Sequence, residues 1–480
     1  MTQYEPVIGL EVHAELLTHS KMFCACPVVD PTTAEPNTAV CPICTAQPGT
    51  LPVVNQQAVA YAIRVGLALN CTINAFNQFA RKSYFYPDLP KGYQISQYEH
   101  PLASDGWLEV ETSDGMKRIG ITRAHLEEDT GKSTHVGDHS LVDLNRAGVP
   151  LLEIVSEPDM RSVEEVEAYA RQIRAILVTL DVNHGDMSKG VLRFEANISV
   201  RPVGSDAFFT RTEIKNLNSI RSLVRASRYE IERQIAVHEA GGTVVQQTLG
   251  FNEATGETVA QRSKEQAHDY RYFPEPDIPP LRISREWVEE VRAALPELPD
   301  ARRDRLIAEH GIPRQDAEVL VGDKAVADYY EAVVAAGADA KAAANWVTGE
   351  LFRLLNAGDT ELSDLRTSPA ALAGLIALVE AGTINQNTAK TVLGEMVESG
   401  QTAEAIVEAK GLAQISDEGA LGQIVDGVIA ANPDEVASYL GGKDALIGWF
   451  VGQVMRETRG KANAQVVGEM LRDRLEAQRG

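Results

Sequence analysis

The sequence predicts an α+β protein, in which a mixed N-terminal domain precedes helical domains. Before residue 290, runs of β-branched and aromatic residues such as 7–12 and 194–201 indicate strands. Near residue 290 the composition turns to Ala, Leu, Glu and Arg, with apolar residues three and four positions apart, which is typical of helices. The chain has 480 residues, enough for roughly two to four domains.

The N-terminal region contains helices as well as strands. Helical periodicity extends from about Val163 to Thr179 and from Ser219 to Ala240, so this region is mixed rather than all-β. After the proline-dense stretch Pro274 to Pro280, the first helix of the helical half includes 287–292, and Leu295 to Pro299 breaks it. We therefore expect a domain over 1–290.

A second boundary is expected within the helical half. Gly411 and the helix start at Asp417 indicate a break around Ala405 to Ala420. Asn432 to Glu435 also resembles a helix start, with proline in the first turn and acids near the positive end of the dipole. The predicted helical domains are then 291–407 and 408–480.

Charge and hydropathy exclude some functions. The formal net charge of −23 argues against a protein that coats nucleic acid nonspecifically, although it permits one local basic face. The longest apolar or glycine stretch, Ala370 to Val379, is much shorter than the ~20 residues that cross a bilayer, and no basic and apolar leader opens the chain. We expect a cytoplasmic protein with no membrane contact.

Four of the five cysteines form two close pairs, Cys24 with Cys26 and Cys41 with Cys44. Two tight knuckles that each supply two thiolates are typical of a tetrahedral Zn²⁺ site. Since protein would fill all four positions, the predicted zinc is structural. A disulfide or redox pair is the alternative, less suited to a chain with no secretory leader. Cys71 lies in an apolar segment and is expected to be buried.

Histidine and carboxylates recur in strand-like segments. Glu11 and His13 are two residues apart and so share one face of a strand, and further acids occur in 125–129 and at Glu153. Such a set suits Mg²⁺ that also holds phosphates. The alternative is that these acids only face solvent at a sheet edge. Gly131 to Ser133 resembles the end of a P-loop, but Leu126 occupies the earlier glycine position.

Two further segments have an amino-acid composition that is typical of ligand-binding regions. Residues 82–97 mix aromatics, Lys and amides, as in a ligand-facing loop, although an aromatic core loop is the alternative. From Arg193 to Arg233 there are eight Arg or Lys against five Asp or Glu. This segment is either a basic patch for phosphates or an ordinary solvated helix face.

Seven blocks of the sequence, in order, resemble the B subunits of the aspartyl/glutamyl-tRNA amidotransferases, the GatB family. They are Val7–His13, Pro48–Pro52, Tyr84–Gln94, His125–Asp129, Asn145–Ile154, Lys215–Ser219, and Arg262–Glu265 with Asp269–Asp277. The resemblance reaches from the N-terminus to about residue 283. It implies a cradle-shaped catalytic domain that includes the zinc knuckles, then a helical domain and a small YqeY-like tail.

The resemblance also implies an activity and partners. Members of this family convert Glu-tRNA(Gln) to Gln-tRNA(Gln), or Asp-tRNA(Asn) to Asn-tRNA(Asn), in a heterotrimer with the amidotransferase subunits A and C. ATP phosphorylates the side-chain carboxylate, and ammonia delivered from the A subunit displaces the phosphate. In agreement, no activated nucleophile for a glutaminase is evident here, since Cys71 is the only cysteine outside the two pairs. The implied cofactors are ATP, Mg²⁺ and structural Zn²⁺.

Residue roles follow from the resemblance. It implies that a Mg²⁺-facing set is formed by Glu11, His13, Glu127 and Glu153, with Glu128 and Asn197 as neighbours. The candidates for contacts to phosphates or to the transition state are Lys82, Lys91, Arg146 and Lys215. A metal-dependent nuclease and a noncatalytic tRNA-binding scaffold remain as competing functions. The sequence does not decide between Glu-tRNA and Asp-tRNA as substrate.

The C-terminal tail is expected to contact the body of the tRNA. From Arg456 to Gly480 there are six Lys or Arg against four Asp or Glu, a positive region in an acidic chain. The residues expected to contribute are Arg456, Arg459, Lys461, Arg472 and Arg474. Balanced charges on a solvated helix face are the alternative.

Overall fold

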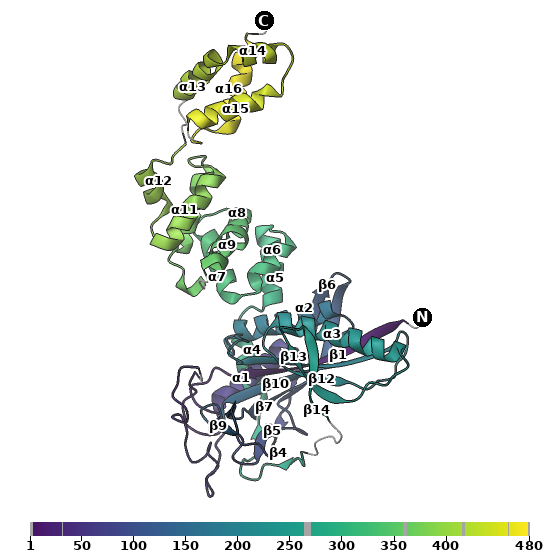
Figure 1. Ribbon diagram of the computed structural model, residues 1–480. Helices are drawn as coiled ribbons and strands as arrows, with labels where there is room; N and C mark the ends of the chain where they lie inside the picture. Colours follow the sequence, from purple (N-terminus) through teal and green to yellow (C-terminus); the bar gives the residue numbers. More distant parts are fainter. Residues whose placement is uncertain are drawn as a thin grey trace. The chain divides into compact units, whose positions relative to one another are not determined.

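The computed structural model describes residues 3–30, 32–263, 270–358, 362–414, 418–458 and 460–478. The chain divides into two compact units, Met1–Ala301 and Arg302–Gly480 (Figure 1). The first unit combines sheets with helices and the second is helical, which confirms the α+β fold class. Some residues of the sequence predictions lie outside the described residues, namely Asp417, Arg459, and Lys264, Glu265 and Asp269 of the last block.

A nine-stranded sheet forms the centre of the first unit, in the order β14-β13-β12-β11-β1-β10-β7-β6-β2. All pairs are antiparallel except β12 with β13. The strands of this sheet are β1 (Tyr4–Glu15), β2 (Thr72–Ile73), β6 (Ala103–Thr112), β7 (Gly115–Glu128), β10 (Pro150–Ser156), β11 (Leu192–Pro202), β12 (Thr212–Leu217), β13 (Gln247–Asn252) and β14 (Glu257–Ser263).

Smaller sheets and several helices complete the described part of this unit. A three-stranded sheet joins β15 (Phe273–Pro274), β4 (Phe79–Ser83) and β5 (Tyr93–Gln97). Two-stranded pairs are formed by β16 (Leu281–Arg282) with β3 (Phe76–Asn77), and by β8 (Lys132–Val136) with β9 (His139–Asp143). The helices are α1 (Gln56–Ala68), α2 (Val163–Thr179), α3 (Ile220–Glu239) and α4 (Arg285–Ala293).

Alternation along the central strands explains how the large sheet is buried. On β1, Leu10, Val12 and Ala14 are almost fully buried and join one hydrophobic core with residues of α1, α2 and α3. Side chains one position away point to the opposite face, because successive residues of a strand alternate. Figure 1 shows α2 and α3 on one side of the sheet and β4 and β5 on the other. The polar residues of the central strands therefore face the β4–β5 side.

The predicted helices of this unit are confirmed. Helix α2 begins where the Ser162 side chain accepts from the amide of Glu165, and α3 begins where Ser219 accepts from that of Ser222. Helix α4 is the predicted helix around 287–292.

The second unit consists of short helices around two hydrophobic clusters. One includes residues from Leu306 to Val407, with Leu412 packed against it, and the other includes residues from Leu421 to Leu475. Helix α14 begins at Pro433 after Asn432, as predicted. The elements are α5 (Pro299–His310), α6 (Arg314–Val321), α7 (Lys324–Ala335), α8 (Ala340–Asn345), a π-helical segment (Trp346–Leu351), α9 (Phe352–Gly358), a 3₁₀ turn (Leu362–Asp364), α10 (Pro369–Glu380), α11 (Gln386–Ser399), α12 (Ala403–Lys410), α13 (Glu418–Ala431), α14 (Pro433–Leu440), α15 (Leu446–Glu457) and α16 (Ala464–Glu476).

Candidate active site and metal centres

The strand register brings the predicted polar residues into rows across one face of the sheet. His125 on β7 lies opposite Glu153 on β10, which lies opposite His13 on β1. One step along, Glu11 on β1 lies opposite Glu195 on β11. Directly opposed side chains have Cβ atoms only ~5 Å apart, so each row forms a continuous polar surface. Four strands whose residues are far apart in the sequence, β1, β7, β10 and β11, thus contribute to one polar face.

His13, Glu127 and Glu153 form the centre of this site. Their ligand atoms all lie within 4.8 Å of one another, and the two carboxylates are buried. Nε2 of His13 is 3.3 Å from Oε2 of Glu153 and 4.0 Å from Oε1 of Glu127. Two carboxylates and an imidazole converging at this distance are a donor set that fits a divalent cation.

Burial and charge hold these groups in different protonation states. Burial lowers the pKa of His13, but its hydrogen bond to Glu153 and the neighbouring carboxylates outweigh burial and raise that pKa to about 9. Burial instead lowers the pKa of His125 to about 4. Burial raises the pKa of Glu127 to about 7. His13 is thus protonated at neutral pH without a metal, and a cation bound through Nε2 would take the place of this proton.

Glu11 lies in a neighbouring acidic group rather than in the centre itself. Ligand atoms of Glu11, Glu195 and Glu213 lie within 4.8 Å of one another. Burial and the charges of Glu153 and Glu195 raise the pKa of Glu11. Nδ2 of Asn197 donates to Oε1 of Glu11 over 2.9 Å. Lys215 forms ion pairs with Glu195 and Glu213, the latter at 3.2 Å.

The sequence analysis missed Glu195 and Glu213 as site residues, and it missed the contact between His125 and Glu153. Glu195 could have been found, because it is two residues before Asn197 and therefore shares its face of the strand. Glu213 could not have been found from the sequence, because its position opposite Asn197 depends on which strand pairs with β11.

Lys82 supplies a positive charge beside the centre. Burial opposes its charged form, but the charges of Glu127 and Glu153 keep the pKa of Lys82 above its usual range. Its Nζ lies 5.3 Å from the ring centre of Tyr270. This ammonium remains charged at neutral pH and can face an anionic group bound at the centre.

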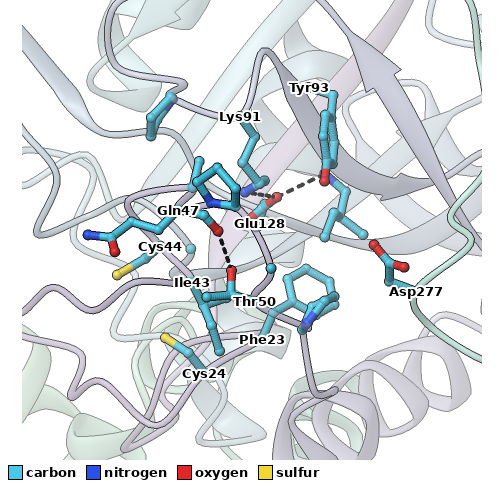
Figure 2. A pocket seen from close by; sticks show the side chains of 17 residues that line it. Phe23, Cys24, Ile43, Cys44, Gln47, Thr50, Lys91, Tyr93, Glu128 and Asp277 are labelled. Carbon is cyan, nitrogen blue, oxygen red and sulfur yellow. Dashed lines mark hydrogen bonds and ion pairs between the residues drawn. The ribbon is translucent and has the colours of Figure 1, made fainter.

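Lys91 and Glu128 lie in a separate cavity. Nζ of Lys91 is 2.6 Å from Oε1 of Glu128, which also accepts from the amide of Ile95. Both line a cavity of about 290 Å³ that Cys24 and Cys44 also border (Figure 2). Glu128 follows Glu127 on the strand, so its side chain points to the other side. The residues that line this cavity do not include His13, Glu127 or Glu153.

The side chain of Arg146 forms hydrogen bonds and an ion pair with other residues of this chain. Its guanidinium donates to the carbonyls of Thr130 and Gly131 at 3.0 and 2.8 Å, and lies 3.7 Å from Asp129. Arg193 also pairs with Asp129, at 2.8 Å. Burial opposes the charged form of Asp129, but the two arginines keep its pKa at about 2.

Other basic side chains of the segment Arg193 to Arg233 also form ion pairs with carboxylates. Arg201 pairs with Glu5 at 2.7 Å, and Arg233 pairs with Glu230 at 2.6 Å. Partners on the strands and on α3 thus neutralise much of the predicted basic patch, which weakens its interpretation as an open phosphate surface.

The four paired cysteines converge, and all five cysteines are free thiols. Sγ of Cys44 is 4.0 Å from Sγ of Cys26 and 3.8 Å from Sγ of Cys41. A disulfide requires about 2.05 Å, so the structure contradicts the disulfide alternative. Four sulfurs at ~2.3 Å from a tetrahedral zinc lie about 3.8 Å apart, which fits these separations. Cys71 is buried outside this group, as expected.

Within the described residues, no helix combines the length and the apolar character that crossing a bilayer requires.

Comparison with known proteins places these features in a family. The model of the GatB/GatE catalytic domain matches residues 6–289, and the model of the GatB domain matches residues 328–475. The chain is 54% identical over 478 residues to the B subunit of the aspartyl/glutamyl-tRNA(Asn/Gln) amidotransferase of Geotalea uraniireducens, covering 98% of this chain and 99% of that protein. The same subunit of Moorella thermoacetica is also 54% identical over 478 residues, with 98% and 100% covered. That of Geobacter sulfurreducens is 53% identical over 477 residues, with 98% and 99% covered. The chain therefore belongs to the GatB family, the B subunits of the aspartyl/glutamyl-tRNA(Asn/Gln) amidotransferases, and is a subunit of the tRNA-dependent amidotransferase.

Proposed function

We propose that this chain carries the ATP-dependent kinase and transamidase site of the amidotransferase. The observation that supports this most is the convergence of His13, Glu127 and Glu153 beside the charged Lys82. The proposed complex is a cytoplasmic heterotrimer with the amidotransferase subunits A and C. The A subunit produces ammonia from glutamine, and the substrate is Glu-tRNA(Gln), Asp-tRNA(Asn) or both.

The reaction requires activation of a poor electrophile. An oxygen of the substrate side-chain carboxylate attacks the γ-phosphorus of ATP, the bond to ADP breaks, and an acyl phosphate forms. Ammonia then attacks the acyl carbon, and inorganic phosphate leaves with the former carboxylate oxygen. The nitrogen of the attacking ammonia loses one proton to solvent or to the departing phosphate as the amide forms.

The residues of this chain would contribute mainly electrostatics and positioning. His13, Glu127 and Glu153 would hold Mg²⁺, which when bound neutralises phosphate charge and orients the transferred group. Lys82 would face the negative charge that develops on the phosphoryl oxygens. Glu11, Asn197 and Lys215 form a polar group beside this centre and would position the nucleotide or the acyl group. The pairing of Arg146 with Asp129 supports a structural role for that arginine.

The test is a reconstituted assay with purified subunits, ATP, and each misacylated tRNA in turn. ADP and amidated tRNA should form in equal amounts with either glutamine or ammonium as nitrogen donor. A nuclease would instead shorten the tRNA without ATP, and a scaffold would show no turnover.

We further propose that the last helices contact the tRNA body. The side chains of Arg456 and Arg472 are exposed, whereas Arg474 pairs with Asp426 at 2.9 Å. Helix α12 continues past residue 407, and Leu412 still packs on the preceding core. We therefore propose that the boundary of the tail lies after Leu412.

Truncation after Gln414 should weaken tRNA binding while leaving the zinc site and assembly with the A subunit intact. The first helical core ends before this point, so it is preserved. Loss of a few phosphate contacts should raise the Kd for tRNA by about tenfold or more at fixed salt, and should reduce its salt dependence. Filter binding or fluorescence anisotropy measures this. An unchanged tRNA affinity would exclude the tail as a contact.

A further inference from the structure

A buried lysine lies beside the four paired cysteines. Lys21 is 0% exposed, and its Nζ donates to the carbonyl of Leu144 over 3.2 Å. Within the described part of the chain, no carboxylate forms an ion pair with Lys21, whereas such pairs are formed by Lys91, Lys117, Lys189 and Lys215. Burying an ammonium is strongly unfavourable unless an anionic group compensates its charge. The burial of Lys21 therefore indicates an anion other than a carboxylate.

The side chain of Lys21 lies close to Cys44. A Cβ atom on Gly148 would lie 3.6 Å from Cδ of Lys21 and 3.8 Å from Cβ of Cys44, so both side chains border the same small space. A hydrogen bond with Cys24 is the largest cause that lowers the pKa of the Cys44 thiol to about 4, and the charge of Lys21 also lowers this pKa, although burial opposes it. The charge of Lys21 thus acts on the sulfur atoms.

The four paired cysteines supply such an anion when they bind zinc. Four thiolates together exceed the charge of one Zn²⁺ ion, so the complete group carries a net negative charge. Cys44 is buried, and water screens a buried charge poorly. A cation inside the protein is therefore well placed to offset the charge of this group.

Glu128 is the carboxylate that borders the same space, with Oε2 3.9 Å from the Cβ position at Gly148. Its other oxygen, Oε1, lies 2.6 Å from Nζ of Lys91 and accepts from the amide of Ile95 at 2.9 Å. Figure 2 shows Lys91 beside Glu128 in the cavity that Cys44 also borders. Since Lys91 compensates Glu128, the charge of Lys21 is left for the cysteines.

The hydrogen bond to Leu144 does not by itself explain a lysine at this position. The neighbouring Asn145 already holds this segment, because its side chain accepts from the amide of Ala39 and donates to the carbonyl of Glu35, both at 2.8 Å. A neutral side chain could supply one more hydrogen bond without burying a charge. The positive charge of Lys21 therefore has a purpose beyond support of this segment.

We propose that Lys21 is the charge-compensating residue of the zinc site. Its ammonium offsets the negative charge of the zinc and its thiolates, and so strengthens zinc binding without coordinating the metal. The backbone of the same residue supports the first cysteine pair, since its amide donates to the carbonyl of Cys26 at 2.9 Å. This inference goes beyond the proposed function, because it concerns the metal that stabilises the first unit and not the reaction centre.

The zinc affinity of the full-length chain tests this, measured by competition with a chromogenic chelator. Lys21→Met removes the charge and keeps most of the volume, and it should weaken zinc binding by about 10–100-fold, the usual effect of losing a group that supports a metal ligand. The matched control is Lys189→Met. Lys189 is 49% exposed and pairs at 3.3 Å with Asp30, which lies between the two cysteine pairs. Solvent screens this charge, so the control should bind zinc within about twofold of wild type.

Unfolding midpoints distinguish charge compensation from simple support of the fold. With zinc bound, Lys21→Met should unfold about 3 °C or more below wild type. After zinc removal this difference should shrink, because thiols that lose the metal take up protons and fewer sulfur atoms carry a negative charge. A lysine with a merely structural role would lower both midpoints equally, and that result would overturn the proposal.

A second variant, Lys21→Gln, keeps the proposal testable if Lys21→Met fails to fold. Glutamine retains an N–H donor for the carbonyl of Leu144 but carries no charge, so zinc binding should weaken by about the same factor as in Lys21→Met. Wild-type zinc affinity in this variant, or a wild-type chain that binds no zinc, would overturn the proposal. Failure of the proposed function would appear differently, as a wild-type complex without ATP-dependent amidation.

Discussion

Replacing Glu153 by Gln should reduce amidation by more than about 100-fold, with either glutamine or ammonium as donor. Glu153 contacts both histidines of the centre, at 3.3 Å from His13 and 3.6 Å from His125. Loss of a group that only supports a metal ligand typically costs 10–100-fold, so loss of a direct ligand should cost more than about 100-fold. ADP formation and amide formation should fall together, because both depend on the same phosphorylation step. Parallel assays of ADP and of amidated tRNA measure this.

The matched control is Glu5→Gln on the same sheet. Glu5 is also on β1 but pairs with Arg201 at 2.7 Å, away from the cluster of His13, Glu127 and Glu153. This variant should retain nearly full amidation. Glutaminase activity of the A subunit should remain measurable in both variants. Full amidation by Glu153→Gln with ammonium as donor would show that the cluster is not the metal centre.

Replacing Cys41 by Ser should remove about one zinc per chain and destabilise the first unit. Sγ of Cys41 is 3.8 Å from that of Cys44, and the amide of Cys41 donates to the Cys44 sulfur at 3.0 Å. A structural zinc stabilises its surroundings directly, because the unfolded chain does not offer a preformed site. The thermal unfolding midpoint should therefore fall by about 5–10 °C. Elemental analysis and calorimetry measure the two effects.

Cys71→Ala provides the control for this second prediction. Cys71 is the one cysteine outside the cluster and is buried against the core of the first unit. Its loss removes one sulfur from the core and should lower stability slightly while the zinc content stays at one per chain. Zinc-free wild-type protein with the same unfolding midpoint would contradict the structural role of the metal.

The sequence predicted the strands and helices well where local signals were strong. Helix α2 begins and ends at the predicted residues because Ser162 caps it and Glu164 and Glu165 follow in the first turn. The cysteine cluster was also predictable, since two short knuckles bring their own ligands together. Both features depend on residues close in the sequence.

Features that depend on strand pairing could not be predicted in this way. Whether Glu11 joins His13 or a separate acidic group depends on the order β10-β1-β11-β12, which no local pattern contains. The resemblance implied Glu128 only as a neighbour of the Mg²⁺-facing set, and it did not reveal that the carboxylate of Glu128 lies 2.6 Å from Nζ of Lys91. The resemblance likewise did not reveal that Arg146 is bound by backbone carbonyls.

Oxygen transfer tests most directly whether this chain's His13 centre phosphorylates the substrate carboxylate. The reconstituted complex would receive Glu-tRNA(Gln) labelled with ¹⁸O in both oxygens of the side-chain carboxylate, together with unlabelled ATP and ammonium. The account predicts that each amide formed releases one phosphate carrying a single ¹⁸O, and that Glu153→Gln abolishes this labelled phosphate. Amidation that releases only unlabelled phosphate, or labelled phosphate at the wild-type rate from Glu153→Gln, would contradict it.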